Sequence, residues 1–378
     1  MQAFAGVVEI QDLLSLLPSR IRKMEGYVPG LQKNDPEIIK LNSNENPYPP
    51  SEAVRHALLT LANSAQTPLQ KYPAPTAGGL RRAIESRYGL AAGSVLAGNG
   101  SDEVLALLFR ALLDPGQSFV IARPTYSLYP VLAAATGLKC LEVPLKEDFH
   151  MDFSALLKAA AESNSSLIVL AMPNAPTGLS EKKEELEDFI RSFPGWIILD
   201  EAYAPFGDVS FMSRAGGEFS NLICTSTFSK AWSLAGLRVG WMAAHPDLIQ
   251  EVDKIRDSYN LSRAAQMAAT AAIEDVDWQK ENARKICATR ERLATELKSL
   301  GFECLESSAN FIFARVPSGT DEEAKRIQQE LENRKILIRY FSSEPIRSYL
   351  RISIGTDKEM DRLLAELDNI LKKNPEEA

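Results

Sequence analysis

The stretch CTSTFSKAWSLAGLRVGW, residues 224–241, contains a single lysine, Lys230, in an unusual setting. An apolar run leads into it, small and hydroxylated residues surround it, and Arg238 follows among glycines. Lysines are almost never buried without a partner, because their charge is strongly hydrated. A single lysine in such a place is more often a surface residue than a chemical group, so its role has to be judged together with the segments around it.

Upstream of this lysine, short apolar runs alternate with helical patterns. The runs cover residues 94–98, 118–122, 139–143, 166–172, 196–200 and 222–226. Helical patterns cover residues 51–65, 77–90, 102–113 and 181–193. Strands that are apolar throughout and alternate with helices are typical of a largely parallel sheet covered on both faces. We predict an α/β fold with a large domain over residues 51–268.

The two ends of the chain differ from this middle part. Residues 1–50 form a proline-rich arm, in which long helices are disfavoured. After a helical region without strands at 264–301, apolar runs at 310–316, 335–341 and 350–355 alternate with helical patterns. Few strands with long helices predict a smaller α+β domain over 269–378, against which we expect the arm to pack.

Composition excludes several classes of function. The formal net charge of −8 argues against general nucleic-acid binding, which needs a basic stripe. The four cysteines form no CxxC pair and the three histidines fit no zinc spacing, so we expect no metal site. No apolar run is long enough for a membrane helix, and the first residues lack a basic leader, so we expect a cytoplasmic protein.

Polar or aromatic groups follow nearly every predicted strand. The segments are GNGSDE, PTY, PNAPTG, DEAY and TFSK, which start at residues 98, 124, 173, 200 and 227. Ligands of open parallel sheets bind beyond the carboxyl ends of the strands, so these segments predict one site. There is no GxxxxGK[ST], and GNGSDE lacks the third glycine of a dinucleotide fingerprint, which disfavours a P-loop and a nicotinamide enzyme.

In this order the motifs resemble those of the fold-type I pyridoxal-phosphate aminotransferases of class I and II. Thr227, Lys230 and Arg238 match the family's hydroxyl residue, Schiff-base lysine and arginine. NENPYP, KYP and LRISIGT complete a likeness that covers residues 25–375. It implies a large domain with a mainly parallel seven-stranded sheet, a smaller α+β domain and pyridoxal 5'-phosphate as cofactor. MEGYVPG, LNSNENPYPPS and IRYFSSEPIRSYLRISIGT resemble the histidinol-phosphate aminotransferase subfamily.

The resemblance also implies roles for single residues. Lys230 would bind the cofactor covalently and then carry the proton, Asp200 would face the pyridine nitrogen, and Tyr203 would contact the ring's phenolic oxygen. Around the cofactor it implies Ser101, Asp102, Glu103, Tyr126, Thr227, Ser229 and Arg238, together with Tyr72 of a second subunit. A homodimer with shared active sites is therefore expected.

One position departs from the family pattern, in which an asparagine directly precedes PTG. Ala175 stands there, and Asn174 is a candidate to replace that asparagine from one residue away. For the substrate, the resemblance implies Arg351 as the clamp for an α-carboxylate, and Arg339 and Tyr27 as contacts of a distal phosphate. Asn44, in the NENPYP segment, is a further substrate-binding candidate.

The leading hypothesis is a transaminase acting between L-histidinol phosphate and 2-oxoglutarate, in histidine biosynthesis. Two alternatives share its chemistry: an aromatic amino acid aminotransferase and a phosphothreonine-type decarboxylase. A third alternative is a non-catalytic regulator that binds the cofactor, although residues 1–50 hold no helix-turn-helix pattern. We expect an amino donor and a 2-oxo acid as ligands, and neither nucleic acid nor a membrane as partner.

Overall fold

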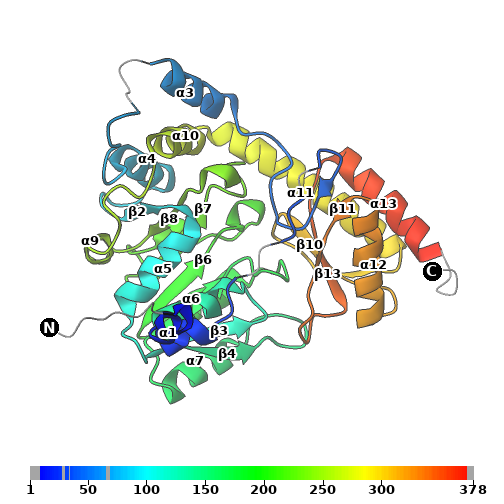
Figure 1. Ribbon diagram of the computed structural model, residues 1–378, viewed down its shortest axis with the longest axis horizontal. Helices are drawn as coiled ribbons and strands as arrows, with labels where there is room; N and C mark the ends of the chain where they lie inside the picture. Colours follow the sequence, from blue (N-terminus) through cyan, green and yellow to red (C-terminus); the bar gives the residue numbers. More distant parts are fainter. Residues whose placement is uncertain (1–8, 28–29, 34, 65–68, 373–378) are drawn as a thin grey trace.

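The computed structural model describes residues 9–27, 30–33, 35–64 and 69–372. They form a larger body around a seven-stranded sheet and a smaller body around a four-stranded sheet, which lie side by side in Figure 1. The large sheet has the order β2-β8-β7-β6-β5-β3-β4. Its strands are β2 (Val95–Gly98), β3 (Ser118–Arg123), β4 (Lys139–Pro144), β5 (Leu167–Ala171), β6 (Trp196–Asp200), β7 (Leu222–Thr227) and β8 (Gly240–Ala243).

The prediction of a mainly parallel sheet is confirmed. Strands β4, β3, β5, β6 and β7 are parallel neighbours, whereas β8 runs antiparallel between β7 and β2. The six predicted apolar runs all form strands, but β8 was not predicted. This strand has only four residues and begins with Gly240, where a Cβ would lie 2.3 Å from the backbone nitrogen of Ser101. Position 240 needs a glycine because the backbone of Ser101 lies so close. Glycine has a low strand propensity, so the sequence holds little sign of β8.

Helices cover both faces of the large sheet, so its strands are buried on each side. In β6, Ile197 and Leu199 face one apolar cluster while Ile198 faces the other. This explains why the strands read as continuous apolar runs. The helices of this body are α3 (Glu52–Asn63), α4 (Gly78–Tyr88), α5 (Gly100–Leu112), α6 (Leu128–Thr136), α7 (Phe153–Glu162), α8 (Lys183–Ser192), α9 (Pro246–Asp253) and α10 (Arg263–Glu274), with 3₁₀ turns η1 (Ala204–Phe206), η2 (Met212–Arg214) and η3 (Ala235–Leu237).

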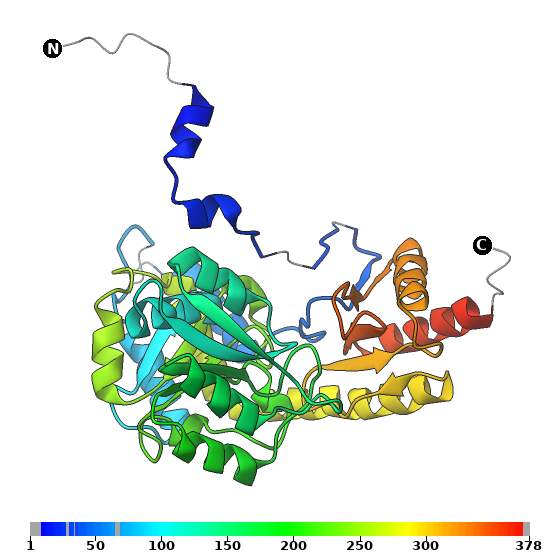
Figure 2. The same cartoon turned by 90° about the horizontal axis from the view of Figure 1, so that it is seen from below.

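The long helical region predicted at 264–301 consists of two helices, α10 and α11 (Val276–Ser299). They are separated at Asp275, whose side chain accepts a hydrogen bond from the backbone N–H of Trp278 and so caps α11. Helix α10 packs on α3 and α4, while α11 runs along the lower side of Figure 2 into the smaller body. The cap explains the break, because a side-chain acceptor satisfies a free N–H at a new helix start.

The smaller body contains a four-stranded sheet of order β12-β13-β10-β9, flanked by α11, α12 (Asp321–Asn333) and α13 (Asp357–Lys372). Its strands are β9 (Glu303–Cys304), β10 (Phe311–Arg315), β12 (Arg339–Tyr340) and β13 (Tyr349–Ser353). The apolar run predicted at 335–341 forms two short strands, β11 (Ile336–Leu337) and β12, and β11 pairs with β1 (Ile39–Lys40) of the arm.

The N-terminal arm touches both bodies. Its β1 strand pairs with the smaller body, whereas the α2 segment (Ser19–Lys23) contacts α6 through a hydrogen bond from Arg20 Nε to the Ala135 carbonyl at 3.2 Å. Figure 2 shows α1 (Ile10–Ser15) standing off the large body. Four large apolar side chains of α1 and α2 are exposed, and so are Leu16 and Leu17 between the two helices. These apolar side chains thus make few contacts with the rest of the described chain.

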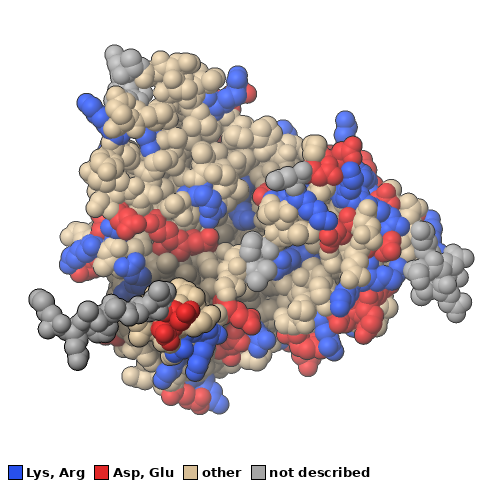
Figure 3. Space-filling model, viewed as in Figure 1, with Lys and Arg blue, Asp and Glu red and all other residues tan. Residues whose placement is uncertain are grey.

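The surface agrees with the charge argument from the sequence. On the face in Figure 3, basic and acidic side chains are interspersed and form no continuous basic stripe. Within the described ranges, no helix has the length and apolar character needed to span a membrane. The same residues hold no group of three or more histidine, cysteine or acidic side chains placed to bind a metal ion.

Candidate active site

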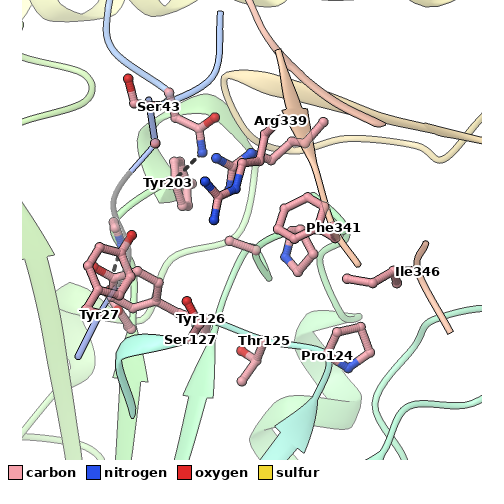
Figure 4. A pocket seen from close by; sticks show the side chains of 18 of the residues that line it. Tyr27, Ser43, Pro124, Thr125, Tyr126, Ser127, Tyr203, Arg339, Phe341 and Ile346 are labelled. Atoms are coloured by element: carbon pink, nitrogen blue, oxygen red, sulfur yellow. Dashed lines mark hydrogen bonds between the residues drawn. The ribbon is translucent and has the colours of Figure 1, made fainter. Parts of the chain in front are cut away.

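A cavity of about 460 Å³ lies where the carboxyl ends of the parallel strands face the small sheet. Asp200 and Thr227, the last residues of β6 and β7, line it from the large body. Arg339 of β12 and Arg351 of β13 line it from the smaller body. Figure 4 shows Tyr27 beside Tyr126 on one side of this cavity and Arg339 near Phe341 on the other. The cavity therefore contains most of the predicted site residues.

Lys230 lies in the turn that follows β7 and projects into this cavity. Its Nζ donates a hydrogen bond to the Ser43 carbonyl at 3.1 Å and lies 5.6 Å from the ring centre of Tyr203. It forms no ion pair with a carboxylate of the described chain. The buried rings of Phe228 and Trp232 anchor the turn on either side. The amine is thus held in place by a neutral acceptor rather than by a counter-charge.

Asp200 lies at the bottom of the cavity and is 5% exposed. Its Oδ2 accepts a hydrogen bond from the Tyr129 hydroxyl at 2.9 Å, and its Oδ1 accepts one from the Ala202 N–H at 3.3 Å. Burial raises the pKa of Asp200 to about 6, against the opposing effect of these hydrogen bonds. A buried carboxylate without a cationic neighbour is expected to favour a ligand that brings a positive charge.

Tyr203 directs its hydroxyl toward the N-terminal arm. The amide Nδ2 of Asn44 donates a hydrogen bond to the Tyr203 oxygen at 2.8 Å, and the Asn44 Oδ1 accepts one from Ser353 Oγ at 3.0 Å. Asn44 has a left-handed backbone with φ of 54°, a conformation that asparagine tolerates better than most residues. The arm thus supplies a buried amide to the cavity at the phenolic oxygen of Tyr203.

A phosphate-sized group could be bound at the start of α5. Helix α5 begins at Gly100, so the first N–H groups of the helix, including that of Ser101, are free for an anion. Arg238, with its Nη1 3.4 Å from Ser229 Oγ, supplies a cation beside them. The hydroxyls of Thr227 and Ser229 are buried at the same place, 3.0 Å apart.

Glycine at position 100 shows how closely this group is packed. Gly100 has φ of +83°, and a Cβ there would lie 2.6 Å from Arg238 Nη2. Only glycine leaves room for the guanidinium beside the helix start. Together with the hydroxyls, the arginine and the free N–H groups, this arrangement fits the phosphate of pyridoxal 5'-phosphate, with Asp200 at the far end for the ring nitrogen.

Asp102 connects the predicted ring contact with the predicted phosphate contact. Its Oδ1 accepts a hydrogen bond from the Tyr126 hydroxyl at 3.2 Å, and its Oδ2 accepts one from Arg238 Nη2 at 3.1 Å. Burial, with Asp102 as the nearest charge, raises the pKa of the Tyr126 hydroxyl well above its usual value. Tyr126 is therefore a neutral donor, fixed in orientation and able to present its ring to the cavity.

The two predicted substrate arginines lie opposite each other. Arg339 and Arg351 are direct cross-strand partners in the antiparallel pair β12–β13. Arg351 Nη2 donates to the Asn42 carbonyl at 3.0 Å, but its Nε is buried without a hydrogen-bond partner. Burial and the neighbouring Arg339 lower the pKa of the Arg351 guanidinium. Phe341 lies 5.7 Å and 5.6 Å from the two guanidinium carbons.

Three predicted site residues do not line the cavity. The Asn174 amide is bonded to Thr125, Thr177 and the Pro124 carbonyl and does not line the cavity, whereas Ala175 does. Glu103 accepts hydrogen bonds from the Asn99 N–H and the Asn260 amide, so it holds the turn before α5. Tyr72 is 76% exposed and stacks on Tyr259 with ring centres 4.3 Å apart.

Two contributors to the site were missed from the sequence. Tyr129, three residues after Tyr126, donates to Asp200 from behind the cavity lining, although nothing in the local sequence distinguishes it from a packing residue. Phe341 follows Arg339 by two residues, and strand alternation places both on one face. That alternation was the available signal for Phe341.

Comparison with known proteins supports one family. Residues 36–367 match the family described as Aminotransferase class I and II. The chain is 42% identical to the histidinol-phosphate aminotransferase of Clostridium acetobutylicum over 88% of its own length and 93% of that protein. It is 40% identical to histidinol-phosphate aminotransferase 2 of Rhizobium meliloti, over 88% and 93% of the two chains.

Among solved structures, the fold matches histidinol-phosphate aminotransferase from Sinorhizobium meliloti in complex with pyridoxal-5'-phosphate. The TM-score is 0.86 and the sequence identity 28%, over 95% of this chain and 98% of that chain.

Proposed function

The chain belongs to the class I and II aminotransferase family, and on that premise we propose that it transfers an amino group between L-histidinol phosphate and 2-oxoglutarate. We propose pyridoxal 5'-phosphate as its cofactor. The relatives named above are histidinol-phosphate aminotransferases and cover most of the chain. The relative from Sinorhizobium meliloti was solved with that cofactor.

The observation that carries this proposal is the pair of arginines beside Lys230. Arg339 and Arg351 line one cavity, and neither forms an ion pair with a carboxylate of the described residues. Histidinol phosphate has a phosphate but no α-carboxylate, whereas glutamate has two carboxylates. A cavity with two free guanidinium groups can bind each of these anionic substrates in turn. We assign the distal phosphate to Arg339 and Tyr27, and the α-carboxylate of glutamate to Arg351.

When bound, the cofactor supplies an aldehyde that reacts with amines and a ring that accepts electrons from the substrate carbon. The residues around it hold and orient it. Asp200 keeps a proton on the ring nitrogen, because a buried carboxylate favours a cationic neighbour. Tyr129 supports this role by holding the carboxylate through its 2.9 Å hydrogen bond.

Lys230 is proposed as the covalent attachment point and the proton carrier. Its Nζ is held by the Ser43 carbonyl, which accepts a hydrogen bond without contributing a charge. With the cofactor in place, the same nitrogen would take the proton from the substrate carbon that bears the amino group. Because the lysine amine stays close to the reacting atoms, it would then return that proton and complete the amino transfer.

The phosphate of the cofactor is assigned to the start of α5. We propose that the N–H groups of Ser101 and Asp102, the hydroxyls of Thr227 and Ser229, and the Arg238 guanidinium bind it. Tyr126 is assigned to the ring face. Asn174 and Glu103 are left out of this set, since their side chains are bonded outside the cavity.

Asn44 is the proposed replacement for the asparagine that the family carries before PTG. Its amide donates to Tyr203 at 2.8 Å, so the two side chains together can contact one phenolic oxygen. Ala175 leaves space beside them in the cavity. The amide would thus come from the arm rather than from the loop after β5.

A homodimer completes the proposal. Tyr72 is exposed and stacked on Tyr259, which suits a side chain that extends into the active site of a second subunit. We also propose the arm 1–50, the large domain 51–268 and the small domain 269–378 as the units of the chain, with the boundary inside α10 and a cytoplasmic location.

A survey of half-reactions tests the function. The holoenzyme is mixed with L-histidinol phosphate, L-glutamate, L-phenylalanine or phosphothreonine, and conversion of the cofactor is followed by absorbance. We expect fast conversion by histidinol phosphate and glutamate. Faster conversion by phenylalanine would make the aromatic alternative correct, and release of carbon dioxide would identify a decarboxylase. A visible band that no amine bleaches would indicate a regulator.

A further inference from the structure

A second cavity of about 350 Å³ shares no lining residue with the active-site cavity. It is bounded by the end of α4, the turn η1 and the first turns of α11. Its volume is at the lower end of the range for small-molecule sites, roughly 300–1,000 Å³. Nothing in the proposed transamination uses it.

The ends of two strands connect this second cavity with the first. Asp200 and Thr227 line the active site, whereas their neighbours Glu201 and Ser226 line the second cavity. Successive residues of a strand point to opposite faces, so one pair of strand ends serves both cavities. A ligand in the second cavity would therefore contact residues covalently joined to the proposed cofactor contacts.

The deep part of the second cavity contains a carboxylate and an unused amide. Glu201 is 2% exposed, its carboxylate accepts hydrogen bonds from Ser210 Oγ and the Phe211 N–H, and no cation of the described chain pairs with it. The Gln279 side chain is 6% exposed, lines the cavity and makes no hydrogen bond to any described residue. Its amide atoms stay accessible from the cavity, so a ligand or water can satisfy them there.

The mouth of the cavity carries three basic side chains, Arg87, Lys280 and Arg284, and one carboxylate, Asp208. Arg284 is paired with Glu281. Arg87 lies over the Tyr88 ring, 5.7 Å from its centre, and forms no ion pair within the described ranges. Lys280 is exposed at the mouth and is likewise without an ion pair there. Tyr88 also lines the cavity, and its hydroxyl makes no hydrogen bond to any described residue. An anionic group at the mouth would find two free cations.

From this distribution we propose that the second cavity binds a free amino acid as a zwitterion. The ammonium group lies toward Glu201 and the Gln279 amide oxygen, and the carboxylate lies toward Arg87 and Lys280. Each end of the ligand meets the opposite charge. The Glu201 carboxylate gains a cationic partner, and the Gln279 amide gains a hydrogen-bond partner. The ligand links α4 of the large body with α11, the helix that continues into the smaller body.

Cys287 gives a direct readout of occupancy, because it lines this cavity and does not line the active-site cavity. The holoenzyme is treated with iodoacetamide in the presence of L-histidine, L-arginine, L-glutamate or L-phenylalanine, and modification of Cys287 is followed by peptide mass spectrometry. Modification of Cys304 serves as the internal control. At about ten times the dissociation constant, a bound ligand should slow Cys287 modification roughly tenfold.

Variants separate this site from the active site. Gln279→Met and Arg87→Gln should each weaken the protection about tenfold in apparent affinity, since each removes a partner of a charged group. Arg82→Gln, which changes an exposed arginine of the same helix, should leave it unchanged, and so should Arg351→Ala in the first cavity. The N-acetylated and amidated forms of the effective amino acid should not protect.

The proposal is overturned if none of these amino acids protects Cys287, or if protection is equal in Gln279→Met, Arg87→Gln and the unaltered protein. It is also overturned if Arg351→Ala abolishes the protection, because the effect would then come from the active site. Protection by the N-acetylated form alone would show an anion site and contradict the zwitterion.

Discussion

Arg339 and Arg351 face each other directly across the antiparallel strands β12 and β13. Like charges at directly opposed positions destabilise a sheet. No carboxylate of the described residues relieves the repulsion through an ion pair, and Arg351 Nε is buried without a partner. A pair kept at such a cost indicates anionic substrates, and the two guanidinium groups differ enough in surroundings to be tested separately.

Arg339→Ala should reduce the half-reaction with histidinol phosphate far more than the half-reaction with glutamate. The variant loses a guanidinium–phosphate contact worth about 1.5–3 kcal/mol, which corresponds to roughly a tenfold to hundredfold loss in kcat/KM. Single-turnover absorbance measurements with each amine give the two values. Arg347→Ala, which removes an exposed arginine paired with Glu344, is the matched control. Equal losses for both amines would contradict the assignment of Arg339 to the phosphate.

Lys230→Ala should bind the cofactor without a covalent bond and should lose turnover by roughly 10²–10⁴-fold or more, since the proton carrier is missing. Borohydride treatment of the unaltered holoenzyme should add the cofactor mass to the peptide that contains residue 230, and no such mass should appear in the variant. Lys254→Ala, an exposed lysine paired with Glu251, is expected to behave like the unaltered protein. A label on another peptide would exclude Lys230 as the attachment point.

Much of this site was predictable because its residues follow strands. A buried parallel strand has a continuous apolar run, and the residue that ends it lies at the ligand-binding edge. Asp200, Thr227 and Lys230 could therefore be assigned from the sequence to one site. The short strand β8 could not be identified, because Gly240 is selected for close contact with Ser101 and gives no strand signal.

The direction of side chains in turns was less predictable. In the loop after β5, the sequence leaves open whether Asn174 or Ala175 faces the cavity, and hydrogen bonds to Thr125 and Thr177 decide this by turning Asn174 away. Likewise, Asn44 reaches Tyr203 from 159 residues away in the chain, a contact that no local pattern encodes. Such contacts depend on how the arm packs between the two bodies.

Glu201 should make the apoprotein less stable as the pH rises. Burial raises its pKa from 4.5 to about 7, so the folded protein holds this proton more tightly than the unfolded chain does. The resulting stability is fully present below the unfolded pKa and is lost as the pH rises through about 7. Glu201→Gln should reduce the change in the free energy of unfolding between pH 4 and pH 8 by roughly 3 kcal/mol.

Urea unfolding of apoprotein across this pH range measures the effect. Ser210→Ala is the informative companion variant, because Ser210 donates a hydrogen bond to the Glu201 carboxylate and opposes the rise in its pKa. Loss of that bond should move the decline in stability to higher pH. A Glu201→Gln variant with the pH dependence of the unaltered protein would show that Glu201 has the same pKa in the folded and unfolded states.

Complementation between two inactive variants should reveal whether Tyr72 serves the site of a second subunit. Tyr72→Ala is expected to bind the cofactor weakly and Lys230→Ala to be inactive, so each homodimer alone should have little activity. A hybrid dimer contains one site with Lys230 from one subunit and Tyr72 from its partner. After unfolding and refolding an equal mixture, random pairing in a two-fold dimer restores about a quarter of the original activity.

A Tyr259→Ala variant tests the stacking contact in the same assay. Tyr259 lies against Tyr72 with ring planes 16° apart, so its removal should loosen the Tyr72 side chain and weaken cofactor binding in dimers that retain Tyr72. Mixing Tyr259→Ala with Lys230→Ala should then restore activity. In the hybrid dimer, the Tyr259→Ala subunit supplies Lys230, and the Lys230→Ala subunit supplies a Tyr72 that is still stacked on Tyr259. No recovery in the Tyr72→Ala mixture, while hybrid dimers are detected by native mass spectrometry, would place Tyr72 in the active site of its own subunit.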